Sequence, residues 1–551
     1  MAIKKRWIAL GAVAIMAAAG YVAFQHYWYY IPGIVSRWRD PVLPNQAVTW
    51  QQGPATAPAI RRPNVLFILA DDLGFNDLSF NGGGVAGGKA PTPHIDAIAH
   101  EGVIFKNGYA GNATCAPSRA AIMTGRYATR FGFEFTPAPK AFEKLVATYD
   151  YDGRHGYYDK AHEDAFPPDS NLLTVPTGEI MLPRLMHDAG YRTLFLGKWH
   201  LGGTPVTRPE AKGFDETLGF LEGAALYAPS GDPSVEESHQ DFDPIDKFLW
   251  ANLNFAVENN GSRHFAPSRY MTDYLGDEAV KAIHANRNRP WFMYLTFNAI
   301  HTPFQALKSD YDALPGIKDH RLRVYAAMLR ALDRNVGKVM DQLKRDGLDD
   351  NTLVIFTSDN GGAQYIGLPD INKPYRGWKA TFFEGGIHVP FFLRWPGRIA
   401  AGTTYDKPVA HVDIFATTAA VAGAAVPHDR IVDGVNLLPY VAGENAARPH
   451  QTLFFRSGSY ATLLDGDWKL QAMDKPYAKL WLYNLAADPT EQHNLSTPGA
   501  GRTAELLKEL RAISARQHKP LWPSLLLGPE TVDHPLSYPD SPSDEVIYWA
   551  N

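Results

Sequence analysis

The amino-acid sequence predicts an α/β fold: a mixed, mostly parallel sheet sandwiched by helices, followed by a smaller C-terminal subdomain of antiparallel sheet plus one helix. Short runs that are apolar at every residue are too short for helices and are typical of strands covered on both faces. Helical patterns lie between these runs, and alternating strands and helices favour a parallel sheet. After about residue 443 the pattern changes to short strands separated by turns.

The strands expected in the large domain occupy residues 65–70, 193–196, 291–297, 353–357 and 389–395. Helices are expected at residues 93–101, 180–189 and 321–345, where apolar residues recur at helical spacing. In the C-terminal subdomain, strands are expected at residues 452–456, 460–464, 468–472 and 480–483, before an amphipathic helix at about 504–517. The stretches 133–175 and 225–270 fit neither pattern and are expected to form loops over the active face.

The composition divides the 551 residues into five segments, because a chain of this length exceeds one small domain. An apolar N-terminal segment (1–35) precedes a linker (36–61) that has no periodicity. The large domain that carries the candidate site is expected at 62–442, and the α+β subdomain at 443–520. The last segment (521–551) is rich in Pro and Ser and is expected to wrap the surface.

The N-terminal segment predicts export from the cytoplasm. Lys4, Lys5 and Arg6 precede an apolar stretch, an order that is typical of export signals. Aromatic residues at 27–30 suit a membrane interface, which favours a retained transmembrane anchor, with cleavage after Ala19 as the alternative. Since positive residues stay inside, the rest of the chain is expected in the periplasm or another extracytoplasmic space, with the membrane as a partner.

Composition argues against two classes of feature. The net charge of −5 leaves no broad basic surface, so no nucleic-acid partner is expected. Cys115 is the single cysteine, so no disulfide can form within the chain. A lone cysteine is either a small buried apolar residue or a chemical group, and its neighbours must decide between the two.

Polar side chains follow four of the predicted strands, where ligands of α/β sheets bind. These residues are Asp71 and Asp72, Lys198 and His200, His301, and Asp359 and Asn360. The set of Asp71, Asp72, Asp359 and Asn360 offers only oxygen ligands, which favour Ca²⁺ or Mg²⁺ over zinc. The sequence therefore predicts a divalent-metal site at this edge of the sheet.

Cys115 is predicted to begin a helix. Pro117 suits the first turn of a helix, and Gly125 can end it. Cys115 would then lie at the positive end of the helix, with Arg119 one turn further along the same face. Such a position favours anion binding and a chemical role for the cysteine.

Residues 115–119 (Cys-Ala-Pro-Ser-Arg), followed by Thr124-Gly125-Arg126, resemble the motif of type I sulfatases. These are formylglycine-dependent, arylsulfatase-like enzymes of the alkaline-phosphatase superfamily. Other segments resemble the family's metal-binding loops (64–74 and 358–361), its second signature (197–202), the lysine at 379 and its C-terminal pattern (482–495). The resemblance covers roughly residues 62 to 500, so 62–442 is expected to be a catalytic sulfatase domain.

The resemblance implies a sulfuric ester hydrolase that cleaves a sulfate monoester to alcohol and sulfate. A formylglycine-generating maturation enzyme would modify Cys115, and the aldehyde hydrate, bound to the metal, would attack sulfur. The implied metal ligands are Asp71, Asp72, Cys115, Asp359 and Asn360. The family favours Ca²⁺, while the ligand types also permit Mg²⁺.

The resemblance also implies a role for each candidate catalytic residue besides Cys115. His200 would help to deprotonate the second hydroxyl of the hydrate, and His301 would protonate or hydrogen-bond the leaving oxygen. Lys198 and Lys379 would hold sulfate oxygens, so that Lys198, His301 and Lys379 form the substrate-binding set. Arg119 would steady the formylglycine and the carboxylates.

Two alternative functions remain at this stage. A phosphonate monoester or phosphodiester hydrolase could use the same fold and the same modified cysteine. A membrane-tethered binding protein would carry an unmodified thiol at Cys115. The alcohol part of the substrate is not readable from the sequence, because aromatic loop residues can stack on an aryl, steroid or sugar ring.

Overall fold

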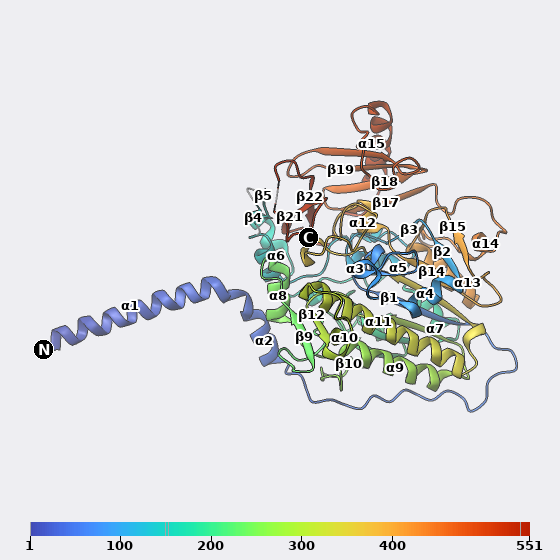
Figure 1. Cartoon of the computed structure of the whole chain (residues 1–551), viewed down its shortest axis with the longest axis horizontal. Coiled ribbons are helices and arrows are strands. Elements are labelled where there is room, and N and C mark those ends of the chain that lie inside the picture. The colour runs from blue at the N-terminus through green and yellow to red at the C-terminus, as the bar shows by residue number, and fades with distance from the viewer. Residues whose placement is uncertain (1, 149, 152–153, 540) are drawn as a thin grey trace.

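A nine-stranded mixed sheet forms the centre of the protein in the computed structural model, which describes residues 2–148, 150–151, 154–539 and 541–551 (Figure 1). The strand order is β10-β8-β7-β11-β1-β13-β14-β2-β15. The parallel block consists of β8 (Glu216–Phe220), β7 (Arg192–Lys198), β11 (Trp291–Thr296), β1 (Asn64–Ala70) and β13 (Thr352–Ser358). The outer strands are β10 (Glu258–Asn259), β14 (Phe391–Arg394), β2 (Val103–Phe105) and β15 (Thr403–Tyr405).

The register of β1 brings the carboxyl ends of its neighbours to one edge of the sheet. Leu69 pairs with Thr296 of β11 and with Thr357 of β13. The parallel strands therefore end side by side, and the loops that follow them start from one place.

Two helical layers cover the sheet, and β1 supplies side chains to both. Leu66 and Ile68 belong to one hydrophobic core, whereas Val65 and Phe67 belong to the other, as alternation along a strand requires. The first core includes residues of α4 (Pro93–His100), α9 (Met271–Asn286) and α11 (His320–Arg345). The second includes residues of α5 (Cys115–Thr124), α7 (Leu182–Asp188) and α13 (Val412–Ala422). The predicted α/β sandwich is therefore confirmed, and every strand and helix expected in the large domain is present with small shifts at its ends.

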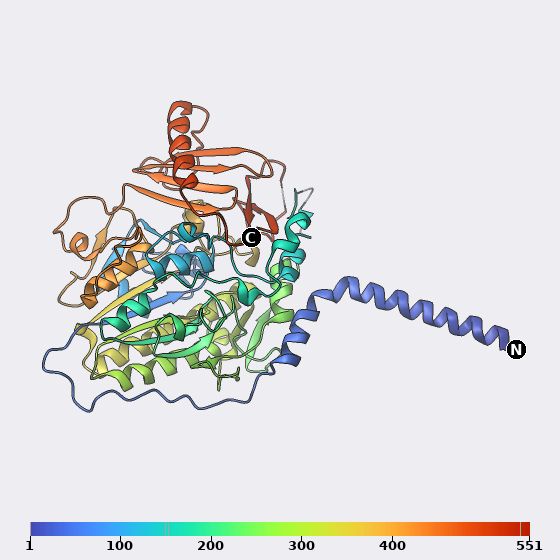
Figure 2. The same cartoon turned by 180° about the vertical axis from the view of Figure 1, so that it is seen from behind.

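The C-terminal subdomain is an antiparallel sheet with one helix, as expected (Figure 2). Its strands pair in chain order: β17 (Thr452–Ser457), β18 (Tyr460–Asp465), β19 (Trp468–Met473) and β20 (Lys479–Asn484). Leu506 and Leu510 of α15 (Ala500–Ala515) are buried against Leu463 and Leu470 of the sheet. The subdomain thus has its own small core.

The last residues do more than wrap the surface. They form β21 (Leu526–Thr531) and β22 (Val546–Ala550), which make a small sheet with β6 (Tyr157–Tyr158). Ile547 is fully buried and Trp549 almost so. The Pro- and Ser-rich composition concealed these two buried strands.

The two stretches expected to be loops contain helices. They hold α6 (Lys140–Val146) and α8 (Pro244–Asn252), whose Phe142 and Phe248 rings lie 5.4 Å apart. Asp243 accepts hydrogen bonds from two backbone amides and caps the start of α8, and Pro244 occupies its first turn. The expectation of loops alone was therefore wrong, because a short helix can be defined by its cap instead of its periodicity.

The remaining short helices and strands are α2 (Ile31–Arg39), α3 (Val85–Gly88), α10 (Lys308–Asp312), α12 (Glu384–Ile387), α14 (Leu438–Val441), β3 (Gly108–Tyr109), β4 (Asp150–Tyr151), β5 (Arg154–His155), β9 (Val235–Ser238), β12 (Phe304–Leu307) and β16 (Val409–Ala410).

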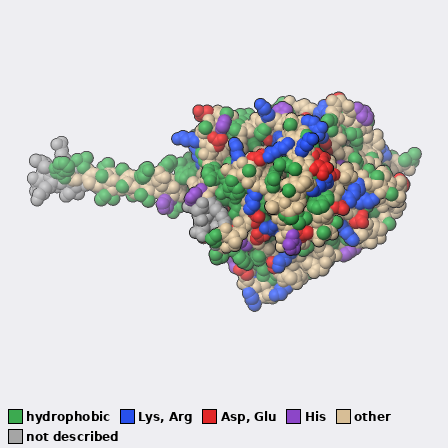
Figure 3. Space-filling view, turned by 90° about the horizontal axis from the view of Figure 1, so that it is seen from above, with side chains coloured by type: hydrophobic (Ala, Val, Ile, Leu, Met, Phe, Trp, Pro, Cys, Tyr) green, Lys and Arg blue, Asp and Glu red, His purple; other side chains and the backbone are tan. Residues whose placement is uncertain are grey.

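The N-terminal helix α1 (Ala2–Tyr27) projects away from the body of the protein (Figures 1 and 3). Its Trp7, Ile15 and Tyr21 are exposed. Within the described ranges, no helix combines the length and the apolar character needed to cross a membrane. The transmembrane anchor expected in residues 1–35 is therefore not supported.

Candidate active site

The aligned strand ends gather most of the residues that the sequence singled out. Asp71 and Asp72 directly follow β1, and Asp359 and Asn360 directly follow β13. Lys198 is the last residue of β7, and His301 lies in the loop after β11. All of these side chains are buried.

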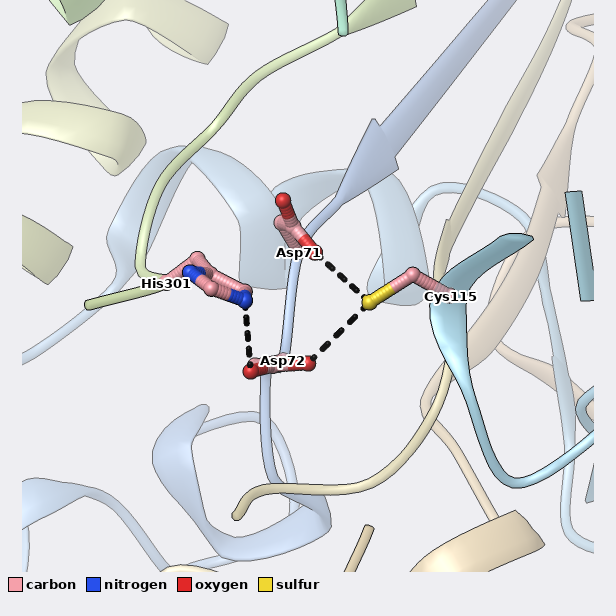
Figure 4. A group of neighbouring side chains, drawn as sticks. All are labelled: Asp71, Asp72, Cys115 and His301. Carbon is pink, nitrogen blue, oxygen red and sulfur yellow. Dashed lines mark hydrogen bonds and ion pairs between the residues drawn. The ribbon is translucent and has the colours of Figure 1, made fainter. Parts of the chain in front are cut away.

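Asp71, Asp72, Cys115 and His301 form a tight cluster (Figure 4). Each offers one potential ligand atom, and these atoms lie within 4.8 Å of one another. The Cys115 Sγ is 3.6 Å from Asp71 Oδ1 and 3.7 Å from Asp72 Oδ1. Asp72 Oδ2 lies 3.5 Å from His301 Nε2.

Cys115 is held at this point by α5, which begins at the cysteine as expected. Thr114 has extended backbone angles and precedes the helix, and Gly125 ends it with φ 67°. Every residue of α5 is buried. The N-terminus of α5 therefore has a fixed position beside the carboxylates that Cys115 contacts, and this end of a helix favours negative charge.

The second acidic loop closes the cluster. Asp359 Oδ1 accepts a hydrogen bond of 3.2 Å from the backbone amide of Asp72, and Asn360 Nδ2 donates to Asp72 Oδ1 at 2.7 Å. The buried Asn360 Oδ1 has no hydrogen-bond partner among the described residues. An unpaired amide oxygen beside three carboxylates fits a hard cation such as Ca²⁺ or Mg²⁺.

Three cationic side chains compensate the buried carboxylates. Arg119 Nε donates to Asp359 Oδ2 at 2.9 Å, and Lys198 Nζ donates to Asp71 Oδ2 at 2.7 Å. Lys379 Nζ donates to Asp72 Oδ2 at 2.9 Å. Each carboxylate thus has its own cation, as a buried charge requires.

The electrostatics distinguish the two adjacent aspartates. Burial raises the pKa of Asp71 to about 7, although Lys198 opposes that rise. Burial also acts to raise the pKa of Asp72, but Lys379, His301 and Lys198 together hold it below its usual value. Burial, with Asp359 nearby, raises the pKa of the Cys115 thiol, so an unmodified thiol stays protonated.

The two histidines are neutral for the same physical reason. Burial, aided by Lys379, lowers the pKa of His301 to about 3. Its Nδ1 donates to the Thr302 carbonyl at 2.5 Å, which leaves Nε2 facing Lys379 Nζ at 3.3 Å. Burial and then Lys198 lower the pKa of His200 well below its usual value.

His200 and Asp72 hold their side chains with unusual backbone angles. Their φ angles are 61° and 57°, in the left-handed region that non-glycine residues seldom adopt. In the part of the chain that the structure describes, neither ring nitrogen of the buried His200 has a hydrogen-bond partner. These features are typical of residues that are placed for chemistry.

A cavity of about 370 Å³ leads to this cluster. It is lined by Cys115, His200, His301 and Lys379, together with residues of several surface elements. Lys198 and Arg119 do not line the cavity and are fully buried against the carboxylates. Lys198, His301 and Lys379 were all expected to bind substrate, but only His301 and Lys379 line the cavity.

Sequence reasoning missed two residues at the cavity, Tyr365 and Glu530. The Tyr365 hydroxyl donates to Asp72 Oδ2 at 3.2 Å and accepts from Lys379 Nζ at 3.2 Å. Burial, together with Asp243, raises the pKa of Glu530 well above its usual value. Tyr365 belongs to no recognised motif, and Glu530 lies in the tail that was expected on the surface.

Comparison with known proteins shows similarity over most of the chain. Residues 63–424 match the family described as "Sulfatase", and residues 376–517 match "N-sulphoglucosamine sulphohydrolase, C-terminal". The chain is 31% identical to the N-acetylgalactosamine-6-sulfatase of Mus musculus over 454 residues, which covers 81% of this chain and 77% of that protein. It is 30% identical to the steryl-sulfatase of Mus musculus, covering 85% of this chain and 84% of that protein.

Solved structures give the same picture of the fold. The structure of Ps i-CgsB in complex with k-i-k-neocarrahexaose has a TM-score of 0.69 and 32% identity, and the match covers 84% of this chain and 95% of that one. The phosphonate monoester hydrolase of Agrobacterium radiobacter has a TM-score of 0.56 at 20% identity, covering 82% of this chain and 96% of that one. At that identity the second match speaks for the fold alone.

Proposed function

The chain belongs to the sulfatase family of enzymes and has its alkaline-phosphatase-like fold, and from this we propose that it hydrolyses a sulfate monoester with a nucleophile derived from Cys115. One observation carries the proposal: Cys115 Sγ lies within 3.7 Å of Asp71 and Asp72 at the end of a cavity. A cysteine with only a packing role would not require two neighbouring carboxylates, a position at a helix N-terminus and a cavity that leads to it.

We assign the metal to the oxygen donors of Asp71, Asp72, Asp359 and Asn360, with residue 115 as a further ligand. Formylglycine at position 115 supplies, as its hydrate, two hydroxyl groups on one carbon, and a divalent cation stabilises negative charge on oxygen. The N-terminus of α5 adds its own positive field to that of the nearby cations. Ca²⁺ is favoured through the family, and the donor set accommodates Mg²⁺ as well.

Lys379 and His301 are the residues that we place on the substrate, because both line the cavity. The Lys379 ammonium binds a sulfate oxygen. The proton between Lys379 Nζ and His301 Nε2, which are 3.3 Å apart, is available to the leaving oxygen. The Thr302 carbonyl fixes the orientation of the His301 ring.

His200 is the base in this proposal. Its neutral ring lines the cavity together with Cys115, and its nitrogens are not engaged by hydrogen bonds to the described residues. A neutral imidazole that is free to accept can take a proton from a hydroxyl on residue 115. Arg119 and Lys198 have a different role in this proposal. They do not line the cavity but hold Asp359 and Asp71 in place, and their positive charges favour an anionic substrate.

The names of the relatives indicate a broad class of substrate and not one compound. Their names concern an amino-sugar sulfate, a sterol sulfate and a carrageenan-type oligosaccharide. A sulfated glycan or a sulfated small molecule is therefore the proposed substrate. A phosphonate monoester is the alternative, and its test is given below.

A maturation enzyme is the proposed partner, and the structure bears on when it acts. Cys115 is only 2% exposed and α5 is buried throughout, so in the folded chain a small molecule can approach the cysteine through the cavity but a second enzyme cannot bind the segment around it. We propose that the modification precedes folding, during export to an extracytoplasmic location.

Mass spectrometry of the tryptic peptide 107–119 tests the modification directly. An aldehyde or its hydrate at position 115 is the expected result. Purified enzyme should hydrolyse 4-nitrophenyl sulfate faster than 4-nitrophenyl phenylphosphonate, and Cys115→Ala should abolish both activities while the far-UV circular dichroism is unchanged. A plain thiol in an active preparation, or wild-type rates in Cys115→Ala, would contradict the proposal.

A further inference from the structure

The short helix α2 (Ile31–Arg39) contributes to the wall of the same cavity that Cys115 lines. Pro32, Gly33 and Ser36 of α2 are all lining residues. α2 follows α1 through the single turn η1 (Trp28–Tyr30) and lies beside α8 (Figure 1). The N-terminal segment, which was expected to act only in targeting, therefore reaches the substrate's approach path.

Specific contacts hold α2 in this position. Gly33 packs so closely on α8 that a Cβ there would lie 2.5 Å from the Ala251 carbonyl oxygen. Asn252 Nδ2 donates to the Tyr29 carbonyl at 3.0 Å, and Arg37 Nη2 donates to the Ala251 carbonyl at 3.2 Å. These contacts tie both ends of the turn and helix to the catalytic domain, so α2 is a built part of the cavity.

The part of the cavity near α2 is mostly apolar, with Ser36 of α2 and Asn252 of α8 as its polar side chains. Phe142 of α6 and Phe248 and Leu249 of α8 line it. Among the lining residues that the structure describes, and histidines aside, the charged ones are Lys379, Glu222 and Glu530. Lys379 and Glu530 interact electrostatically with each other. Of these three charged side chains, Glu222 is therefore the one without a partner in this set.

We propose that α2 is a specificity-determining wall and that the alcohol part of the substrate is an apolar ring system that packs between α2, α6 and α8. This inference rests on the proposed sulfatase function. Burying apolar carbon against the side chains of Phe142, Phe248 and Leu249 is favourable. Sugar hydroxyls placed against these three side chains would lose their hydrogen bonds to water without replacement. The volume of about 370 Å³ is near the lower end of ligand pockets and suits one small ring system better than a polymer.

A matched pair of esters tests the substrate class. Cyclohexylmethyl sulfate and galactose 6-sulfate are both sulfates of a primary alcohol on a six-membered ring, and they differ in the ring oxygen and the hydroxyls. We expect kcat/KM to be about ten-fold or more higher for cyclohexylmethyl sulfate, through a lower KM. A preference for galactose 6-sulfate would overturn the inference.

Substitutions test the role of α2 in the full-length enzyme. Ser36→Trp narrows the mouth of the cavity and should raise KM for cyclohexylmethyl sulfate about five-fold or more, with kcat within about two-fold. Ile34→Trp is the matched control, because Ile34 lies on the same helix, is exposed and does not line the cavity. Equal effects of the two variants, or none from Ser36→Trp, would overturn the role of α2.

A polarity change gives a second measurement that does not depend on the shape of α2. Leu249→Asn should lower the preference for cyclohexylmethyl sulfate over galactose 6-sulfate about ten-fold, whereas Leu172→Asn, at an exposed leucine outside the cavity, should leave it unchanged. Thermal unfolding confirms that each variant is folded. 4-Nitrophenyl sulfate separates the two ideas: no hydrolysis of it by wild-type enzyme contradicts the sulfatase function, whereas hydrolysis without the expected selectivity contradicts only the inference.

Discussion

Gly223 lies directly against the imidazole of His200, so closely that a Cβ at position 223 would be 2.7 Å from His200 Cε1. The glycine thus makes room for the proposed base. Its own φ is unexceptional, so the need for glycine comes from the ring next to it and not from the backbone.

Gly223→Ala should push the His200 ring out of position and lower kcat about ten-fold or more, because general-base catalysis depends on hydrogen-bond geometry. Hydrolysis of 4-nitrophenyl sulfate measures kcat, and thermal unfolding should change little. Gly178→Ala is the control, since no atom of the described residues lies within 4 Å of a Cβ there. Unchanged kcat in Gly223→Ala would remove the reason to place His200 in the reaction.

Tyr365→Phe should remove the hydroxyl that joins Lys379 to Asp72. The loss of these two hydrogen bonds should lower kcat/KM about five-fold and the free energy of unfolding by about 1 kcal/mol. Tyr311→Phe removes a hydroxyl that pairs with the exposed His320 and serves as the control. If both variants behave like wild type in kcat/KM, Tyr365 has no positioning role.

Metal addition should raise the thermal stability of enzyme that has been treated with a chelator. Binding to the folded state alone stabilises it by about 2.7 kcal/mol at a metal concentration of about 100 Kd. Differential scanning fluorimetry with Ca²⁺ or Mg²⁺ identifies the preferred ion by the larger shift. Asn360→Ala and Asp359→Asn should reduce the shift, and a shift that survives in Asp359→Asn would place the ion elsewhere.

His450 and Asp413 predict a pH dependence of stability away from the reaction. Burial opposes protonation of His450, but the carboxylate of Asp413, at 2.7 Å, outweighs it and raises the pKa of His450. A raised pKa in the folded state stabilises the fold below the unfolded value of about 6.5, and this stabilisation disappears as pH rises through the folded value.

His450→Gln should therefore lower the free energy of unfolding more at about pH 5 than at about pH 9. Urea unfolding of both proteins at the two values gives the comparison. An equal loss at both would mean that His450 is neutral in the folded protein.

The sequence predicted the central sheet well, because strands such as residues 65–70 are apolar at every position and cannot be mistaken for amphipathic helices. It also predicted which side chains would meet, because the ends of parallel strands share one edge. The position of Asp71, Asp72 and Asp359 follows from those two facts alone.

Features that depend on tertiary contacts could not be predicted. Lys198 has the same polar character as Lys379, yet its place at the end of a buried strand turns it toward Asp71 and away from the cavity. Glu530 lies in a tail whose composition suggested surface chain, and α2 meets α8 across more than two hundred residues of sequence. No local sequence pattern indicates that Glu530 lines the cavity or that α2 contacts α8.

Alternation along β1 means that its two faces serve two different cores, with Leu66 on one side and Phe67 on the other. If either layer of helices separated from the sheet, the apolar side chains on one face of β1 would be exposed to water. Asp71 and Asp72 directly follow this strand, so the packing of both cores holds their backbone in place. Thermal unfolding of the domain should accordingly be a single cooperative transition, in which the candidate site and the central sheet are lost together.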